Sequence, residues 1–263
     1  AFIVSDSIPE FIPSHLRSSF TRTIQPGCRL IVRDKRDSSI EEMTSLKQSG
    51  RVITIDDCGP GRELADCAID LLPNLKYSIT KKGLFIYGYA FSDSIRRLGN
   101  QPIRKDIDYA LYCGINPSRE IVDFFLSLVP VKSSCAVLAG NASFIINNGE
   151  KLPLDRSYAE TLLSTRVLIS HFGITLYEGQ LAQCRLITMN PTEYHSHLSD
   201  RAGSELNCIN IGVTGSIDIT EARATLARAI GDHVPLCINP AVINKNVEHG
   251  LLLFISHIQS LME

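Results

Sequence analysis

The sequence predicts an α/β fold built on parallel sheets, and two stretches carry that prediction. Residues 159–203 contain two apolar runs, 166–170 and 185–189, and a turn and a helical segment follow each run. This strand–turn–helix order is typical of βαβα units. Residues 28–55 show the same alternation, with two apolar runs on either side of a helical segment. The whole chain of 263 residues is long enough for two domains with substantial cores.

The elements of the first half follow from apolar runs and capping residues. Strands are expected at 1–5, 28–33 and 51–55, and residues 65–74 are expected to add another. Ser14 is expected to cap a helix that carries His15 and Arg17, and residues 37–39 are expected to cap a helix over 40–48. Asp56 and Asp57 end the strand 51–55. Paired carboxylates there can perform acid–base chemistry or hold a loop by capping, and capping is the favoured interpretation.

The second half continues the same order. Strands are expected at 107–113, 134–139, 166–170, 185–189 and 207–212, and helices at 119–128, from Thr175, up to Gly203, at 219–230 and at 247–262. Residues 99–106 are rich in polar residues, Gly and Pro, as in a linker. We therefore predict domains 1–103 and 104–263, with the last helix crossing back to the first domain.

Composition excludes several classes of function. The net charge of −2 indicates neither a nucleic-acid-binding nor an anionic-membrane-binding surface. The eight cysteines show no CxxC pair and the seven histidines no ligand spacing, so no metal site is expected. Scattered cysteines, no apolar run of about 20 residues and no signal peptide together predict a cytoplasmic protein without a membrane span.

The turn at residues 171–175 is the best candidate binding site. A helix that starts after a parallel strand directs free N–H groups and a positive dipole end towards the sheet's carboxyl edge, where an anion can bind. Gly173 allows close approach, Thr175 adds a hydroxyl, and Glu178 can accept hydrogen bonds from a sugar diol. The spacing of Thr175 and Glu178 also fits a simple capping box, and spacing alone favours that interpretation.

A second turn has the same character. Gly114 allows close approach, and Asn116 and Ser118 can cap the helix that follows. An ordinary capped turn explains these residues equally well.

The stretch 169–178 resembles the C-terminal domain of the UDP-sugar hydrolases of pseudaminic acid biosynthesis and the related MurG-like glycosyltransferases. Their pattern is an apolar residue, then S-x-G-G-x-T-x-x-E, and here it reads I-S-H-F-G-I-T-L-Y-E. The resemblance implies that Gly173, Ile174 and Thr175 hold the nucleotide phosphates and that Glu178 binds the ribose hydroxyls. Phe172 replaces one family glycine, and a family glutamine further along is Thr192 here.

Other family segments match in part. The family's G-G-x-D-P turn, which faces the nucleotide sugar, corresponds to residues 113–117, with Asn116 in place of Asp. The family's Y-A-L segment corresponds to residues 84–91, with Tyr89 on the tyrosine. An S-D-S-like segment contains Asp6.

The family's catalytic segment is also only partly present. The G-H-x-x-R segment, whose His is the proposed general base, corresponds to His15, while the Arg lies one place early at Arg17. The glycines that precede it in the family are absent from residues 8–13.

The resemblance implies two Rossmann-like domains that face a cleft, the GT-B arrangement, with a shortened first domain. It implies a UDP-sugar substrate, no cofactor, and hydrolase or glycosyltransferase activity in the biosynthesis of surface glycans or nonulosonic acids. A catalytically inactive nucleotide-sugar-binding protein of the same fold is the alternative. The sequence leaves the oligomeric state open.

Overall fold

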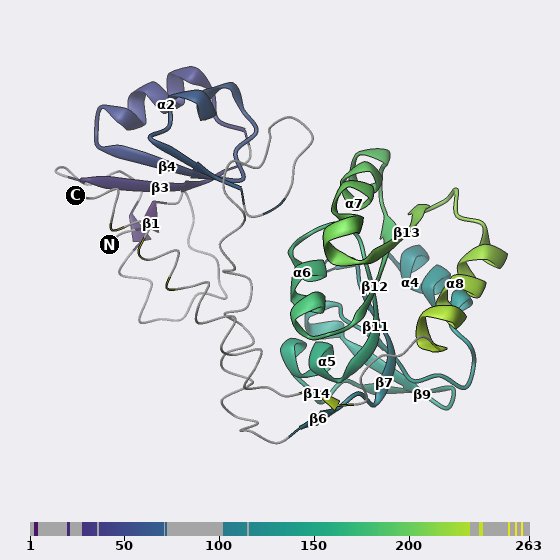
Figure 1. Cartoon of the computed structure of the whole chain (residues 1–263). Helices are drawn as coiled ribbons and strands as arrows, with labels where there is room; N and C mark the ends of the chain where they lie inside the picture. The colour runs from purple at the N-terminus through teal and green to yellow at the C-terminus, as the bar shows by residue number, and fades with distance from the viewer. Residues whose placement is uncertain are drawn as a thin grey trace. The chain divides into compact units, whose positions relative to one another are not determined.

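The computed structural model describes residues 3–4, 20–21, 28–35, 37–70, 72, 102–114, 116–231, 237–238, 252, 256 and 259. The chain divides into two compact units, Ala1–Gly83 with Ser256–Glu263, and Leu84–Ile255. Figure 1 traces both units along the chain. The domain limits 1–103 and 104–263, the returning last helix and the cleft between the domains stay predictions.

The first unit contains a parallel sheet in the order β3-β4-β5, formed by Leu30–Asp34, Arg51–Ile55 and Cys67–Ile69. The helix α2, Ile40–Lys47, connects β3 to β4, and Ser39 caps it by accepting a hydrogen bond from Glu42 N. A 3-10 helix, η1 (Pro60–Leu64), precedes β5. The short strands β1 (Ile3–Val4) and β2 (Phe20–Thr21) pair in parallel. The expected strand 65–74 is therefore shorter than predicted, while α2 and β4 match the prediction closely.

The Asp pair after β4 holds loops, as the capping interpretation requires. The Asp57 carboxylate accepts hydrogen bonds from the backbone N–H groups of Ser38 (3.0 Å) and Gly59 (2.8 Å). Asp56 accepts one from Leu72 N. Behind this loop, the guanidinium of Arg62 forms a buried two-bond ion pair with Asp70, both bonds 2.7 Å long.

The second unit is built on a seven-stranded sheet in the order β10-β9-β8-β7-β11-β12-β13. Its parallel strands are β7 (Ile107–Tyr112), β8 (Cys135–Val137), β11 (Thr165–Ser170), β12 (Arg185–Asn190) and β13 (Cys208–Val213). The antiparallel hairpin β9 (Phe144–Asn147) and β10 (Glu150–Pro153) extends one edge. A separate antiparallel pair joins β6 (Ile103–Arg104) to β14 (Cys237–Ile238). The α/β class with parallel sheets is confirmed.

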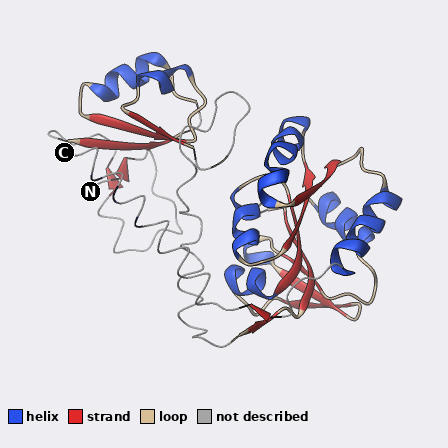
Figure 2. Ribbon diagram, in the orientation of Figure 1, coloured by secondary structure: helices blue, strands red, loops and turns tan. Residues whose placement is uncertain are grey.

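Helices cover both faces of this sheet, as Figures 1 and 2 show. On one face lie α5 (Tyr158–Ser164), α6 (Ile174–Leu181) and α7 (Glu193–Leu206); on the other lie α4 (Arg119–Leu128) and α8 (Ile219–Gly231). The main core lies under α4 and α8, where apolar side chains of alternate strand positions, such as Val167, Ile169 and Ile187, are fully buried. The order of strands and helices matches the predicted βαβα repeat. Ser118 caps α4 as expected, and Asp218 caps α8.

The predicted end of α7 is wrong. The helix continues through Gly203 to Leu206 and ends at Asn207, which adopts the left-handed conformation (φ 51°, ψ 45°) and donates its N–H to the carbonyl of Gly203. Asn is one of the few side-chain-bearing residues that adopt this conformation readily, and it therefore stops the helix where glycine was expected to.

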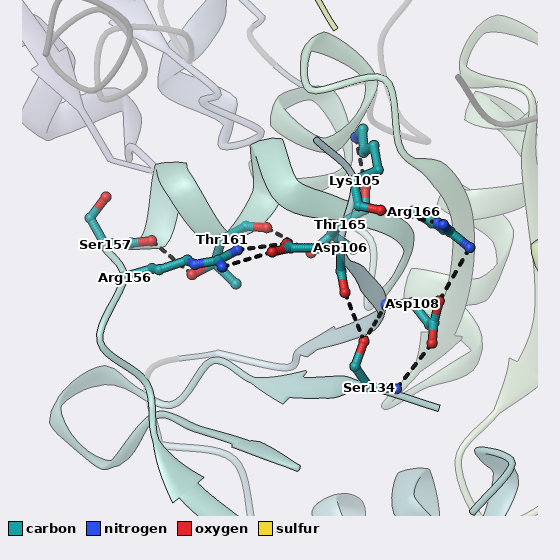
Figure 3. A network of polar contacts seen from close by, with 9 residues as sticks. All are labelled: Lys105, Asp106, Asp108, Ser134, Arg156, Ser157, Thr161, Thr165 and Arg166. Atoms are coloured by element: carbon teal, nitrogen blue, oxygen red, sulfur yellow. Dashed lines mark hydrogen bonds and ion pairs between the residues drawn. The ribbon is translucent and has the colours of Figure 1, made fainter. Parts of the chain in front are cut away.

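A polar network links the start of β7 to the two ends of α5 (Figure 3), and Lys105 of this network also bonds to the end of α6. Lys105 is fully buried, and its ammonium donates to the carbonyls of Thr165 (2.6 Å) and Ala182 (2.5 Å), the residues that end α5 and α6. Nearby, Arg156 forms a two-bond ion pair with Asp106. A cation at two helix C-termini complements both dipoles.

Candidate functional site

The candidate site lies at the carboxyl edge of the second unit's sheet. In the strand register, Ser170 at the end of β11 lies beside Tyr112 of β7 and Thr188 of β12. Because these strands are parallel, the turns that follow them emerge at the same edge, where open α/β sheets bind their ligands. β7 and β11 are direct neighbours in the sheet, so the turns that follow them lie side by side.

The start of α6 is free of a side-chain cap. Its N-cap residue is Gly173, which makes no side-chain hydrogen bond, and Leu176 N bonds back to the Gly173 carbonyl at 3.1 Å. The capping-box interpretation of Thr175 and Glu178 is therefore wrong, because Thr175 lies inside the helix. An uncapped helix start presents N–H donors and a positive dipole end to an anion.

Glycine has a different role in each turn. Gly173 has a φ of 166°, extended backbone that other residues also adopt, and a Cβ there would meet nothing closer than His171 at 4.0 Å. Gly114 has a φ of +94°, which L side chains rarely adopt, and the space beside its Cα is open. The conformation therefore requires glycine at Gly114 only, while both turns leave room for a ligand.

Ser170 is the most unusual polar residue of this edge. It is fully buried, and its hydroxyl has no hydrogen-bond partner among the described residues. Ser170 shares the sheet face of Leu168, which packs against Gly179 of α6. Buried hydroxyls are almost always paired, so this one is available for a ligand or a water molecule.

Glu178 lies one turn into α6 and is only 9% exposed. The Tyr158 hydroxyl from α5 donates to its Oε2 at 2.5 Å, and Thr175 lies 3.1 Å from the same hydroxyl. Burial raises the pKa of Glu178, and the Tyr158 hydrogen bond opposes that rise. Burial, followed by the charge of Glu178, raises the pKa of Tyr158, so Tyr158 keeps its proton and acts as the donor.

A row of rings continues along the edge from this cluster. Tyr112 contacts the Tyr158 ring edge-on (5.6 Å between centroids) and stacks with His171 (6.5 Å), which in turn meets His195 of α7 (6.3 Å). Burial, and secondarily the charge of His195, lowers the pKa of His171. His171 is therefore neutral near pH 7 and can donate or accept a hydrogen bond.

Buried amides hold the turn after β11 in place. The side-chain oxygen of Asn190, a fully buried residue at the end of β12, accepts hydrogen bonds from Phe172 N (3.1 Å) and the Ser199 hydroxyl (3.1 Å). Its amide nitrogen donates to Asn210 of β13 at 3.0 Å. The Phe172 ring is 5% exposed, so packing explains a large residue where the resembling family has glycine.

The remaining predicted residues are placed as follows. Ser118 is the N-cap of α4, Asn116 is exposed, and Ile174 is 41% exposed at the first position of α6. Thr192 caps α7, and its hydroxyl lies 2.8 Å from His195 Nδ1. Four predicted residues lie outside the described part of the chain: Asp6, His15, Arg17 and Tyr89.

The structure adds residues that the sequence did not single out. Tyr112, Tyr158, Asn190 and His195 have no distinctive spacing, because they come from different elements. Ser170 did carry a signal, since it occupies the serine position of the family pattern.

Neither a metal site nor a membrane span is found in the part of the chain that the structure describes. No three His, Cys, Asp or Glu side chains gather there as metal ligands. None of the described helices has the length and apolar character that crossing a bilayer requires.

Comparison with known proteins gives structural neighbours only. No family model and no curated protein matches the chain. It is similar to the glycotransferase of kitacinnamycin, with a TM-score of 0.45 and 11% identity over 84% of this chain and 60% of that one. It is also similar to the spinosyn forosaminyltransferase SpnP, with a TM-score of 0.42 and 13% identity over 81% of this chain and 56% of that one. The chain thus spans less than two thirds of either neighbour.

Proposed function

We propose that this chain binds a UDP-sugar at the carboxyl edge of the second unit's sheet and transfers or hydrolyses the sugar. The observation that carries the proposal is the uncapped start of α6 beside the buried, unpartnered hydroxyl of Ser170. An anion with several oxygens, such as a diphosphate, satisfies both features at once. The sequence resemblance at residues 169–178 supports the same ligand.

In this proposal, the residues at the carboxyl edge of the sheet bind different parts of the nucleotide. The N–H groups of Ile174 and Thr175 bind the phosphates, and the helix dipole stabilises the negative charge that grows on UDP as it leaves. Glu178 accepts hydrogen bonds from the ribose hydroxyls. The turn at Gly114, after the neighbouring strand β7, leaves open space in which the ligand can approach the backbone.

In this proposal, His15 carries out the chemical step. As a general base, His15 activates water in a hydrolase or the acceptor hydroxyl in a glycosyltransferase. Neither route requires a metal or a cofactor, because the leaving group is stabilised by helix N–H groups. The pathway we propose is the biosynthesis of surface glycans or nonulosonic acids.

A catalytically inactive nucleotide-sugar-binding protein is the second candidate. The observation that favours it is the stretch 8–13, where Pro9 and Pro13 stand among residues that replace the family's glycines. The His15→Ala variant separates the two candidates. If the chain is an enzyme, the variant loses turnover of UDP-sugars and keeps its UDP affinity, whereas a binding protein shows no turnover in either form.

Calorimetric titration with UDP tests the binding site itself. Ile174→Pro removes one N–H donor at the first helical position, where proline is well tolerated, and Gly173 already has the extended backbone that precedes proline. One hydrogen bond to a charged group contributes about 1.5–3 kcal/mol, so we expect UDP to bind at least tenfold more weakly.

Ile174→Ala is the matched control, because it shortens the same half-exposed side chain and keeps the N–H group. It should bind UDP as the wild type does. Absence of UDP binding by the wild-type protein would reject the proposed function.

A further inference from the structure

Tyr158 is held rigidly at the first position of α5. Ser157 and Glu160 form a reciprocal capping box around it, in which Glu160 N donates to Ser157 Oγ and Ser157 N donates to the Glu160 carboxylate. The ring contacts Tyr112 edge-on. A tyrosine with its backbone and ring both fixed delivers its hydroxyl to one place.

That place is the Glu178 carboxylate. The three polar groups form a chain: the Thr175 and Tyr158 hydroxyls lie 3.1 Å apart, and Tyr158 donates to Glu178 Oε2 at 2.5 Å. A short O–H···O⁻ hydrogen bond is among the stronger kinds in proteins. Among the described residues, the Glu178 carboxylate accepts its hydrogen bond through Oε2. Oε1 is not one of the buried side-chain oxygens without a partner, so this oxygen is accessible to a ligand.

We propose that Tyr158 is a positioning residue that holds Glu178 by Oε2, so that Oε1 accepts the hydroxyls of a ribose and the site selects ribonucleotides over 2′-deoxyribonucleotides. This inference rests on the proposed function, because it concerns the sugar of the same nucleotide. A free glutamate side chain loses rotamer entropy when it binds a ligand, and a glutamate already held by Tyr158 loses less. Fixed geometry also makes the loss of one ligand hydroxyl costly, since a site built to bond a hydroxyl rejects the analogue that lacks it.

The hydrogen bond also keeps Glu178 in the form that the ligand needs. Burial raises the pKa of Glu178 and favours the neutral acid, while the Tyr158 hydroxyl lowers it and favours the carboxylate. A carboxylate is the better acceptor for two hydroxyl donors. Removing the Tyr158 hydroxyl therefore weakens both the placement and the charge of the acceptor.

The test compares UDP with 2′-deoxy-UDP as ligands of the full chain by calorimetry. We expect the wild type to bind UDP about tenfold more tightly than the deoxy analogue. In Tyr158→Phe, affinity for UDP should fall further than affinity for the deoxy analogue, which keeps its 3′-hydroxyl, until the two ligands bind within about twofold of each other. Glu178→Gln should reduce the preference in the same way.

Tyr109→Phe is the matched control, because Tyr109 is a buried tyrosine of the same unit and its hydroxyl donates to the Leu226 carbonyl on the opposite face of the sheet. It should keep the full preference for UDP. Wild-type preference for UDP in Tyr158→Phe would overturn the inference and leave the binding site standing. A wild-type protein that binds neither nucleotide would overturn the proposed function and the inference with it.

Discussion

Replacing Lys105 by methionine should destabilise the second unit strongly. Methionine has nearly the same length and shape, so the change removes the ammonium group and little volume. The ammonium is fully buried and donates to the carbonyl of Thr165 (Figure 3). It also donates to the carbonyl of Ala182, and Cys184 Sγ lies 3.7 Å away. Without it, the carbonyls that end α5 and α6 lose their cation.

The size of the effect follows from two opposing contributions. Two hydrogen bonds to a charged group contribute together about 3–6 kcal/mol. The desolvation of a buried ammonium, which costs up to several kcal/mol, offsets part of this. We therefore expect Lys105→Met to lower the free energy of unfolding by about 2–4 kcal/mol.

The difference between wild type and variant should also depend on pH. Burial lowers the pKa of Lys105 in the folded state below its ordinary value of 10.5. In the pH window between the folded-state pKa and 10.5, the unfolded chain binds more protons, so wild-type stability rises with pH. The methionine side chain of the variant does not titrate, and the destabilisation caused by the substitution should therefore grow as the pH rises from the folded-state pKa of Lys105 towards 10.5.

Urea denaturation followed by circular dichroism measures these quantities, and hydrogen exchange of the β11 amides assigns the loss to the second unit. Lys132→Met is the control, because Lys132 is exposed in the same unit. It should change stability by less than about 0.5 kcal/mol. The reasoning is refuted if Lys105→Met is as stable as this control.

Further substitutions test three individual features. Asp70→Asn should cost about 3–5 kcal/mol in urea denaturation, because the buried Arg62 guanidinium is left without its carboxylate; a loss below about 1 kcal/mol would show that the pair is not formed. Gly114→Ala should cost about 1–2 kcal/mol at its φ of +94°, whereas Gly173→Ala at φ 166° should be nearly neutral, and equal thermal shifts would contradict this contrast. Asn207→Val should lower stability by about 1–2 kcal/mol as well, because valine disfavours the left-handed conformation, whereas Asn207→Gly should keep wild-type stability. Equal stability of the two variants would show that the left-handed helix end is not formed.

The fold was predictable where local chemistry decides it. Ser39, Ser118 and Asp218 cap helices that begin where the sequence predicts, since a side chain three residues from its N–H partner needs no tertiary information. The hairpin β9–β10 is not among the predicted elements, although its turn carries a strong local signal in Asn148-Gly149, both with positive φ. The turn of this hairpin was therefore predictable from residues 148–149. The end of α7 was not predictable from the position of a glycine alone, because the helix continues past Gly203 to Asn207.

The candidate site was predictable only in part, because its contacts join elements far apart in the chain. The sequence locates the turn before α6 by its place after an apolar run. It leaves open whether Thr175 caps the helix, since the spacing to Glu178 fits a capping box as well as a ligand site. The structure decides this at Gly173, which is the N-cap of α6 and so places Thr175 inside the helix, while Tyr158, 20 residues from Glu178, donates to Oε2 of its carboxylate.

The same contact decides what kind of ligand site this edge can be. A buried glutamate beside an uncapped helix start would be an unsuitable place for a phosphate if its charge faced the same oxygens. Tyr158 fixes the carboxylate by Oε2, and the ring row of Tyr112 and His171 continues from Tyr158 along the edge. A ligand with an anionic part for the helix start and a neutral diol for the carboxylate fits both halves, and a free phosphate fits only one. Inorganic phosphate should therefore compete weakly with UDP in the calorimeter, and competition at equal concentration would show that the diol contributes nothing.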